Sequence, residues 1–279
     1  MISVIKISVI IPTYNRAYSL ERAIKSVLTQ SFPYYELIVV DDGSTDDTAN
    51  LLEKYPQIKV ISQANQGVSV ARNNAVKQAQ GKYLAFLDSD DEWLEHKLEK
   101  QYEFLQKNDY VCVHSDEIWV RNGVRVNPMK KHQKGGGDQF KDSLRLCVIS
   151  PSTIMLQKDV FNQLGGFRED YPVCEDYDLW LKLTARYKIG YIDDLLIKKF
   201  GGHQDQLSRK YFAMDFWRVR SIDEILDYQG LSMDKKEAAI VELLKKATIL
   251  LKGYQKHQNL GADYQQIKSI SDKWQTYLS

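Results

Sequence analysis

Short apolar segments alternate with amphipathic segments through the first ninety residues of the chain. The apolar segments are four or five residues long and rich in β-branched or aromatic side chains, which predicts buried strands. They are 7–11, 37–40, 58–61 and 83–87. The segments between them carry apolar residues at helical spacing and predict helices over 20–28, 44–54 and 68–80, the last with Gly81 as its C-cap.

This order of strand and helix has a consequence for where a ligand would bind. Repeated strand-then-helix units form a parallel sheet with right-handed crossovers, and such sheets bind ligands beyond the carboxyl ends of their strands. Two acidic clusters, Asp41–Asp42 and Asp88–Asp91, directly follow predicted strands. We therefore expect both clusters to line one crevice.

The remainder of the chain is less regular. We predict a helix over 93–106, a strand over 110–114, a hairpin turn at Asn122-Gly123, a strand over 152–156 and a helix that opens at 174–176. The basic, glycine-rich stretch 130–137 predicts a loop over the crevice. From residue 209 onward every predicted element is helical. The sequence thus predicts one domain over 1–208 and a helical C-terminal extension over 209–279.

Composition excludes several classes of protein. With 43% apolar and 27% charged residues in 279, the chain is an ordinary globular protein, and 38 basic against 37 acidic residues give no field that would attract nucleic acid. Cys112, Cys147 and Cys174 are odd in number and widely spaced, which fits neither a disulfide framework nor a zinc motif and favours a cytoplasmic location. Lys6 and Pro12 interrupt the N-terminal apolar run, so we expect no signal peptide there.

Five short motifs occur along the chain in the order in which a known protein family carries them. They are SVIIPTYNR (8–16), ELIVVDDGSTD (36–46), ARN (71–73), FLDSDD (86–91) and EDYDLW (175–180). Each is weak alone, but together they make the chain resemble a family-two inverting glycosyltransferase. The resemblance covers about residues 7 to 203 and implies an α/β, Rossmann-like GT-A fold whose central sheet is mixed and mainly parallel.

The FLDSDD motif is the candidate metal site. Two carboxylates one residue apart at a strand end suit magnesium or manganese, which prefer hard oxygen ligands. The resemblance implies that Asp90 binds the metal, that Asp88 holds the ribose or the metal through water, and that Ser89 lies at the nucleotide. An alternative is that Asp90 or Asp91 caps the helix predicted from residue 93.

The nucleotide site is expected at the ends of the first two strands. A carboxylate can accept the imide N–H of uracil, and the resemblance gives this role to Asp42. It also implies that Tyr14 stacks on the base, while the backbone of Pro12 and Thr13 lines the pocket. Arg72 would contact the nucleotide or the carboxylates. For Asp42 a turn or helix cap, and for Arg72 a plain ion pair, remain alternatives.

The EDYDLW motif is the candidate catalytic element. Inversion is a single displacement, so one carboxylate that takes the proton of the acceptor hydroxyl suffices. By resemblance Asp176 is this base and Glu175 contacts the sugar. Alternatively, both acids only stabilise the start of their helix. His203, after Gly201-Gly202, would bind the metal or the diphosphate, or else lie solvated in a loop.

The resemblance also implies partners and a location. It implies a UDP-sugar donor, a divalent metal (Mn²⁺ or Mg²⁺), and a saccharide or lipid-linked acceptor in the synthesis of surface polysaccharide or glycolipid. The expected location is the cytoplasm, with peripheral contact at the inner face of the membrane as one role for the C-terminal helices and homodimerisation as another.

Two other classes of function are weighed against this one. A nucleotidyltransferase would carry a glycine-rich basic loop after its first strand, but Pro12-Thr13-Tyr14-Asn15-Arg16 contains no glycine. A catalytically inactive nucleotide-binding or interaction module on the same fold stays open. Failure to bind any nucleoside diphosphate would favour that module.

Overall fold

The computed structural model of the chain describes residues 4–127, 132–202 and 213–278. By internal contacts the chain divides into two compact units, each built from three stretches of sequence. The first comprises Met1–Gly137, Val148–Asp170 and Lys188–His203, and the second comprises Asp138–Cys147, Tyr171–Tyr187 and Gln204–Ser279. The boundary predicted at residue 208 falls within 203–212, outside the described residues, and stays a prediction.

A nine-stranded mixed sheet organises the first unit. Its strands are β1 (Ile7–Thr13), β2 (Tyr35–Asp41), β3 (Lys59–Ser62), β4 (Tyr83–Phe86), β5 (Glu92–Trp93), β6 (Cys112–Arg121), β7 (Val124–Val126), β8 (Met155–Gln157) and β9 (Gly190–Gly201). The strands follow the order β3-β2-β1-β4-β8-β6-β9-β5, and β7 pairs with β6. The predicted mixed α/β sheet is confirmed.

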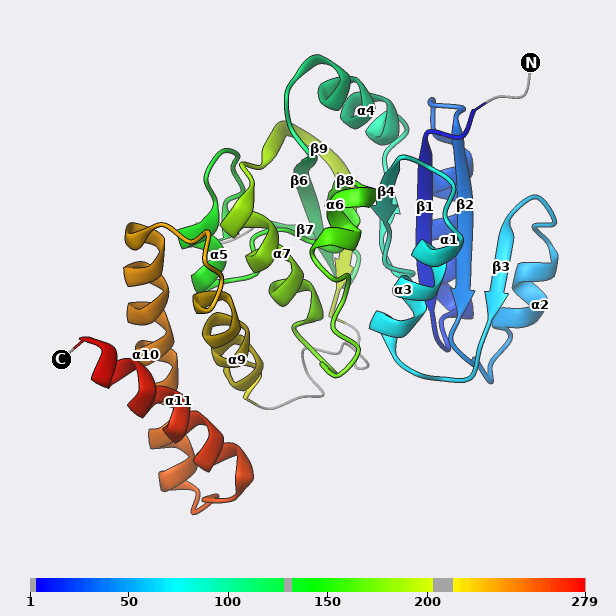
Figure 1. Cartoon of the computed structure of the whole chain (residues 1–279). Helices are drawn as coiled ribbons and strands as arrows, with labels where there is room; N and C mark the ends of the chain where they lie inside the picture. The colour runs from blue at the N-terminus through cyan, green and yellow to red at the C-terminus, as the bar shows by residue number, and fades with distance from the viewer. Residues whose placement is uncertain (1–3, 128–131, 203–212, 279) are drawn as a thin grey trace. The chain divides into compact units, whose positions relative to one another are not determined.

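The first four strands form the parallel half of the sheet. β1 pairs in parallel with both β2 and β4, and β2 pairs in parallel with β3. Figure 1 shows β1, β2 and β3 side by side. The connecting helices are α1 (Ala17–Leu28), α2 (Thr48–Glu53) and α3 (Val68–Gln78). This is the predicted alternation of strand and helix, and it brings the carboxyl ends of β1, β2 and β4 to one edge.

In the parallel half, β1 and β4 and most of β2 are buried on both faces. Alternate residues of each strand face opposite sides of a sheet, and here Ile7 and Val9 pack in a cluster with Ile24 of α1. On the other face Phe86 contacts Phe161, with ring centroids 5.8 Å apart. Strands that are buried on both sides explain the continuous apolar runs in the sequence.

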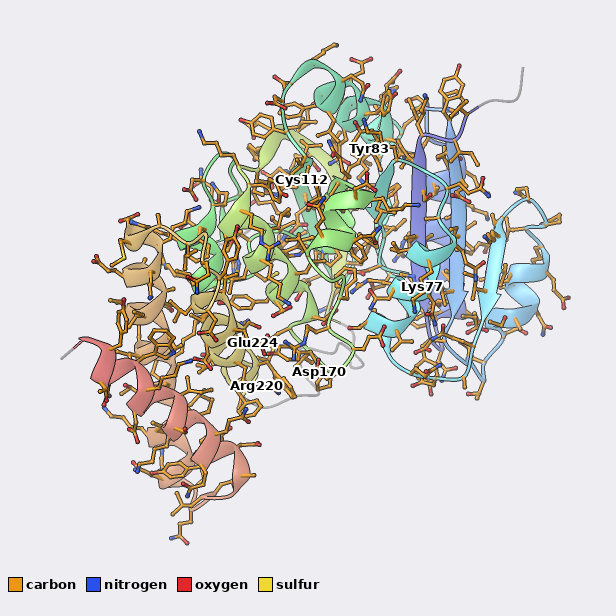
Figure 2. The ribbon with its side chains drawn as sticks, viewed as in Figure 1. Lys77, Tyr83, Cys112, Asp170, Arg220 and Glu224 are labelled. Carbon is orange, nitrogen blue, oxygen red and sulfur yellow. The ribbon has the colours of Figure 1, made fainter. Side chains whose placement is uncertain are left out.

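The second half of the sheet is mixed in direction: the long strands β6 and β9 run with β4, and the short strands β5, β7 and β8 run against it. β8 is antiparallel to β4 and β6, whereas β6 and β9 are parallel to each other. In Figure 2, Tyr83 and Cys112 mark the beginnings of β4 and β6. Asn122 and Gly123 both have positive φ, 50° and 76°, and join β6 to β7 as the predicted hairpin. The remaining helices of this unit are α4 (Lys97–Lys107) and α6 (Lys158–Gln163).

Several local predictions were wrong at their boundaries, among them the strand expected over 152–156, which begins only at Met155. The helix expected from Trp93 begins at Lys97, because Glu92–Trp93 pairs with β9 as a strand. The strand expected to end at 114 continues to Arg121. α3 ends at Gln78, so Gly81 is not its C-cap; a Cβ on Gly81 would lie 2.5 Å from the backbone nitrogen of Ser8, which explains the glycine.

The second unit is helical in its described residues. Its helices are α5 (Phe140–Arg145), α7 (Glu175–Arg186), α9 (Met214–Leu226), α10 (Met233–Lys256) and α11 (Ala262–Leu278). Their core includes Tyr177, Ile222 and Leu243. Figure 2 shows Arg220 and Glu224 on α9, one helical turn apart. None of the helices in the described ranges combines the length and apolar character that crossing a bilayer requires.

Candidate functional site

The loops after β1 and β2 are joined at the carboxyl edge of the parallel half. The register pairs Thr13 with Asp41, the last residues of the two strands. Asn15, at φ 51°, accepts the N–H of Thr45 at 2.7 Å through Oδ1. Its own N–H donates to Ser44 Oγ at 2.9 Å. The predicted PTYN and DDGS segments therefore form one continuous surface.

Asp42 is held by the loop that precedes α3. Its Oδ1 accepts from Gln63 Nε2 at 2.8 Å and from the N–H of Gln66 at 2.9 Å. Its Oδ2 accepts the N–H of Gly67 at 2.8 Å. A carboxylate oxygen can accept two hydrogen bonds, so Oδ2 keeps one acceptor position beyond these contacts. The predicted helix cap is wrong for Asp42, because α2 begins at Thr48 with Asp47 before it.

A chain of side chains behind Asp42 fixes the orientation of Gln63. Its amide oxygen accepts from Asn74 Nδ2 at 2.8 Å, which leaves the amide nitrogen to face Asp42. Lys77, labelled on α3 in Figure 2, donates to Asn74 Oδ1 at 3.0 Å. The loop before α3 is thus organised around the carboxylate.

The predicted base-stacking residue lies at the surface. Tyr14 is 47% exposed, directly after the buried residues Pro12 and Thr13. A ring that is half exposed has surface available for contact with a flat ligand. Its stacking role stays a prediction.

The acidic turn Asp88–Asp91 follows β4 and contacts α3. Arg72 Nη2 lies 2.6 Å from Asp88 Oδ1, and the arginine side chain is only 4% exposed. Ser89 is buried beside them. Burial, and then the charge of Asp88, raise the pKa of Asp90, while Arg16 and Lys199 act in the opposite direction. Asp88 and Asp90 thus form a cluster of negative charge with cations around it.

The cap predicted for Asp90 or Asp91 is also wrong. The helix that follows begins at Lys97, with His96 before it. Asp91 is buried, and its oxygens accept instead from the Phe200 N–H at 3.0 Å and from Ser152 Oγ at 2.7 Å. Asp91 therefore ties the turn to β9 and to the 3₁₀ turn η2 (Pro151–Thr153).

Glu175 and Asp176 belong to the second unit, where they open α7. Cys174 precedes them at φ 64°, a left-handed conformation that is uncommon for a residue with a side chain. Asp176 Oδ1 accepts the N–H of Tyr177 at 2.7 Å, and its Oδ2 accepts from the thiol of Cys147 at 3.3 Å. Both acids lie in the first turn of the helix, so the helix-stabilising alternative remains compatible with this geometry.

Comparison with known proteins identifies the family. The model of glycosyl transferase family 2 matches residues 8–165, more than half of the chain. The chain belongs to glycosyl transferase family 2.

Relatives and a solved structure agree with this assignment. Uncharacterized glycosyltransferase RC0461 of Rickettsia conorii is 36% identical over 196 residues, 69% of this chain. The match covers only 32% of that relative, so this chain spans about a third of its length. The glucosyltransferase WfgD of Escherichia coli is 30% identical over 210 residues, 74% of this chain and 81% of WfgD. The crystal structure of Staphylococcus aureus TarS 1–349 with UDP-GlcNAc matches with TM-score 0.69 and 20% identity, over 97% and 92% of the two chains. The fold is GT-A.

The acidic turn of this family 2 chain has two carboxylates that could bind a metal ion, Asp88 and Asp90. Across 4–127, 132–202 and 213–278, no group of three or more His, Cys, Asp or Glu side chains is arranged to hold one. Asp88 and Asp90 offer carboxylate oxygens only, and magnesium and manganese commonly take their other ligands from waters and phosphates. The two residues therefore fit an ion shared with a diphosphate rather than a closed protein site. His203 lies outside the described residues.

Several polar residues at this site escaped prediction from the sequence. Ser150 Oγ lies 3.2 Å from Lys199 Nζ and 3.4 Å from Lys134 Nζ, and it donates to Glu117 Oε1 at 3.3 Å. Trp119 Nε1 donates to the same Glu117 oxygen at 2.7 Å. No family motif includes these residues, and only the folded chain brings them together.

Proposed function

We propose that this protein is a metal-dependent, inverting glycosyltransferase that moves a sugar from UDP-sugar to an acceptor hydroxyl. The observation that carries the proposal is the pairing of Arg72 with Asp88 in the acidic turn, at the same sheet edge as the organised Asp42 carboxylate. The Asp42 carboxylate suits recognition of the nucleobase, and the acidic turn suits the diphosphate end of a nucleotide. Membership of family 2 supports the reaction type.

In this proposal the residues of the first unit hold the donor. Tyr14 stacks on uracil, the free acceptor position of Asp42 Oδ2 receives the imide N–H, and Pro12 and Thr13 line the base pocket. Asp88 contacts the ribose, or the metal through water, with Ser89 beside it. Asp90 binds Mg²⁺ or Mn²⁺, which would neutralise charge on the departing UDP. His203 is proposed as a further ligand.

Asp176 is the residue that we propose as the general base. Asp176 removes the proton of the acceptor hydroxyl while that oxygen attacks the anomeric carbon and UDP departs, so the configuration inverts. The thiol of Cys147 and the N–H of Tyr177 orient the Asp176 carboxylate. Glu175, buried at the same helix start, would contact the transferred sugar.

The acceptor is proposed from the relatives. WfgD is described as a UDP-Glc:α-D-GlcNAc-diphosphoundecaprenol β-1,3-glucosyltransferase. By analogy we propose a saccharide or lipid-linked acceptor, in the synthesis of surface polysaccharide or glycolipid. We place the protein in the cytoplasm, with peripheral contact at the inner face of the membrane.

The helices of the second unit offer surface for the proposed contacts. Val241 and Ile249 are exposed on α10, where Lys245 and Lys252 are exposed as well. Apolar and cationic side chains together suit an anionic membrane surface, and homodimerisation through the same helices is the alternative. Cosedimentation with phosphatidylglycerol vesicles, together with the mass in solution, distinguishes the two.

The decisive experiment for the donor site is calorimetric titration of UDP with and without Mn²⁺. We expect metal-dependent binding that Asp90→Ala abolishes. The matched control is Asp109→Ala, which removes an exposed acid outside the turn, just after α4. Failure of UDP, GDP, CDP and dTDP to bind would favour an inactive module on the same fold.

The role of Asp176 as the general base is tested by Asp176→Asn in a transfer assay. We expect a loss of about 10²- to 10⁴-fold in kcat, because a general base contributes that much. Titration of UDP should give the same affinity as in the unchanged protein. Full transfer activity in this variant would disprove the role of Asp176.

A further inference from the structure

Ser152 lies between the two ends of the acidic turn. Its side chain is fully buried. The hydroxyl oxygen accepts the backbone N–H of Asp88 at 3.1 Å and donates its proton to Asp91 Oδ2 at 2.7 Å. One hydroxyl thus contacts the first and the last residue of the turn.

The turn is closed by further contacts of the same two aspartates. The N–H of Asp91 donates to the carbonyl of Asp88 at 3.0 Å. Asp91 Oδ1 accepts the N–H of Phe200 in β9 at 3.0 Å. Both carboxylate oxygens of Asp91 are therefore engaged by the protein, which leaves Asp88 and Asp90 as the carboxylates that the turn presents to a ligand.

Ser152 is itself held in place by Trp93. The indole Nε1 donates to the carbonyl of Ser152 at 2.9 Å, and the Trp93 N–H donates to Ser26 Oγ at 3.1 Å. Lys97 Nζ lies 3.7 Å from the centre of the indole ring. These contacts are buried, so the position of the serine is determined by packing and not by solvent.

We propose that Ser152 is a positioning residue for the donor site: it fixes the acidic turn so that Asp88 and Asp90 face the metal–diphosphate group. The inference rests on the proposed function. Substitution of a group that orients a metal ligand commonly costs 10- to 100-fold in metal affinity. The hydroxyl is suited to this task because it donates and accepts at once.

The test is the Mn²⁺ dependence of UDP binding by Ser152→Ala. We expect the Mn²⁺ concentration that gives half-maximal UDP binding to rise about tenfold or more. Ser152→Thr keeps a hydroxyl and should restore much of the affinity. The control is Ser143→Ala, a buried serine of the second unit whose hydroxyl has no hydrogen-bond partner among the described residues. Ser143→Ala should leave the Mn²⁺ dependence unchanged.

The outcomes separate the inference from the proposed function. Normal Mn²⁺ dependence in folded Ser152→Ala would overturn the inference and leave the proposed function standing. Lack of metal-dependent UDP binding by the unchanged protein would overturn both. Should Ser152→Ala fail to fold, Ser152→Cys retains the volume with a weaker donor, and the same shift or its absence decides.

Discussion

The two halves of the sheet place their polar residues in different ways. In the parallel half, Asn15 and Asp42 come directly after strands and contact the neighbouring loops at the edge. In the second half, His114 and Glu117 are buried within β6, and Lys134 forms an ion pair with Glu117 from a loop. The first arrangement leaves acceptor atoms for a ligand. In the second arrangement the charged side chains pair with one another.

This difference shows what each half contributes. Contacts at the end of a parallel strand orient the Asp42 carboxylate and leave one acceptor position of Oδ2 for a ligand. A buried pair such as Glu117 and Lys134, 3.1 Å apart, has to be matched within the protein, because an unpaired charge there is costly. The parallel half therefore suits ligand recognition, and the second half suits rigid support of β9 and its loops.

The largest effect is expected from Glu117→Gln. Burial acts against ionisation of Glu117, but Lys134 and Lys199 outweigh it and lower the pKa to about 2. The substitution would leave Lys134 buried beside a neutral amide, at a cost of about 3–5 kcal/mol in the free energy of unfolding. Urea denaturation at pH 7 measures this loss.

A double substitution provides the control for that prediction. Glu117→Gln with Lys134→Met removes both charges and should recover most of the lost stability, because the uncompensated charge is gone. Equal stability of Glu117→Gln and the unchanged protein would mean that the pair is not buried as described.

The next effect concerns His114 and pH. Burial, and then the charge of Lys134, lower the pKa of His114 to about 3. As the pH falls below about 6.5, His114 becomes protonated in the unfolded chain, whereas in the folded protein it stays neutral until about pH 3. Stability is therefore lost across this window. At pH 4.5 the loss attributable to His114 is about 2–3 kcal/mol.

His114→Gln tests whether protonation of the imidazole, and not the loss of its packing, causes the acid sensitivity. His114 Nε2 lies 2.7 Å from the carbonyl of Gly135, and Nδ1 has no hydrogen-bond partner among the described residues. Glutamine keeps a donor near the Nε2 position and does not titrate. Unfolding measured from pH 7.5 to 4.5 should show a flatter decline in the variant. Parallel declines would assign the acid sensitivity to other groups.

The same difference between the halves explains how much the sequence predicts. Apolar runs bounded by turn residues predict β1, β2 and β4 and place Asp42 and Asp90 at their ends. The Asn122-Gly123 turn predicts the β6–β7 hairpin. These signals come from residues close together in sequence, so they can be recognised without knowledge of the fold.

Other features depend on contacts that no local pattern encodes. Glu92–Trp93 forms a strand because β9, a hundred residues later, supplies its partner. Ser152 contacts Asp91 across 61 residues, and neither its type nor its neighbours in sequence indicate a role. Gly81 is required by the close approach of β1 and not by the end of a helix.

The smallest effect, and the sharpest test of the parallel half, is expected from Asp42→Asn. An amide nitrogen replaces one of the two acceptor oxygens. At the Oδ1 position its N–H₂ would face the donors of Gln63 and Gln66, and at the Oδ2 position it would face the Gly67 N–H and the imide of uracil. UDP affinity should fall about tenfold, which is about 1.4 kcal/mol, while CDP should gain relative to UDP because cytosine offers an acceptor. Calorimetry with both nucleotides measures the ratio of the UDP and CDP affinities.

Asp41→Asn is the control. Among the described residues, Asp41 Oδ1 accepts the N–H of Ser44, and an amide oxygen can accept the same hydrogen bond. An unchanged ratio in Asp42→Asn would assign base recognition to another residue and reduce Asp42 to a support of its loop.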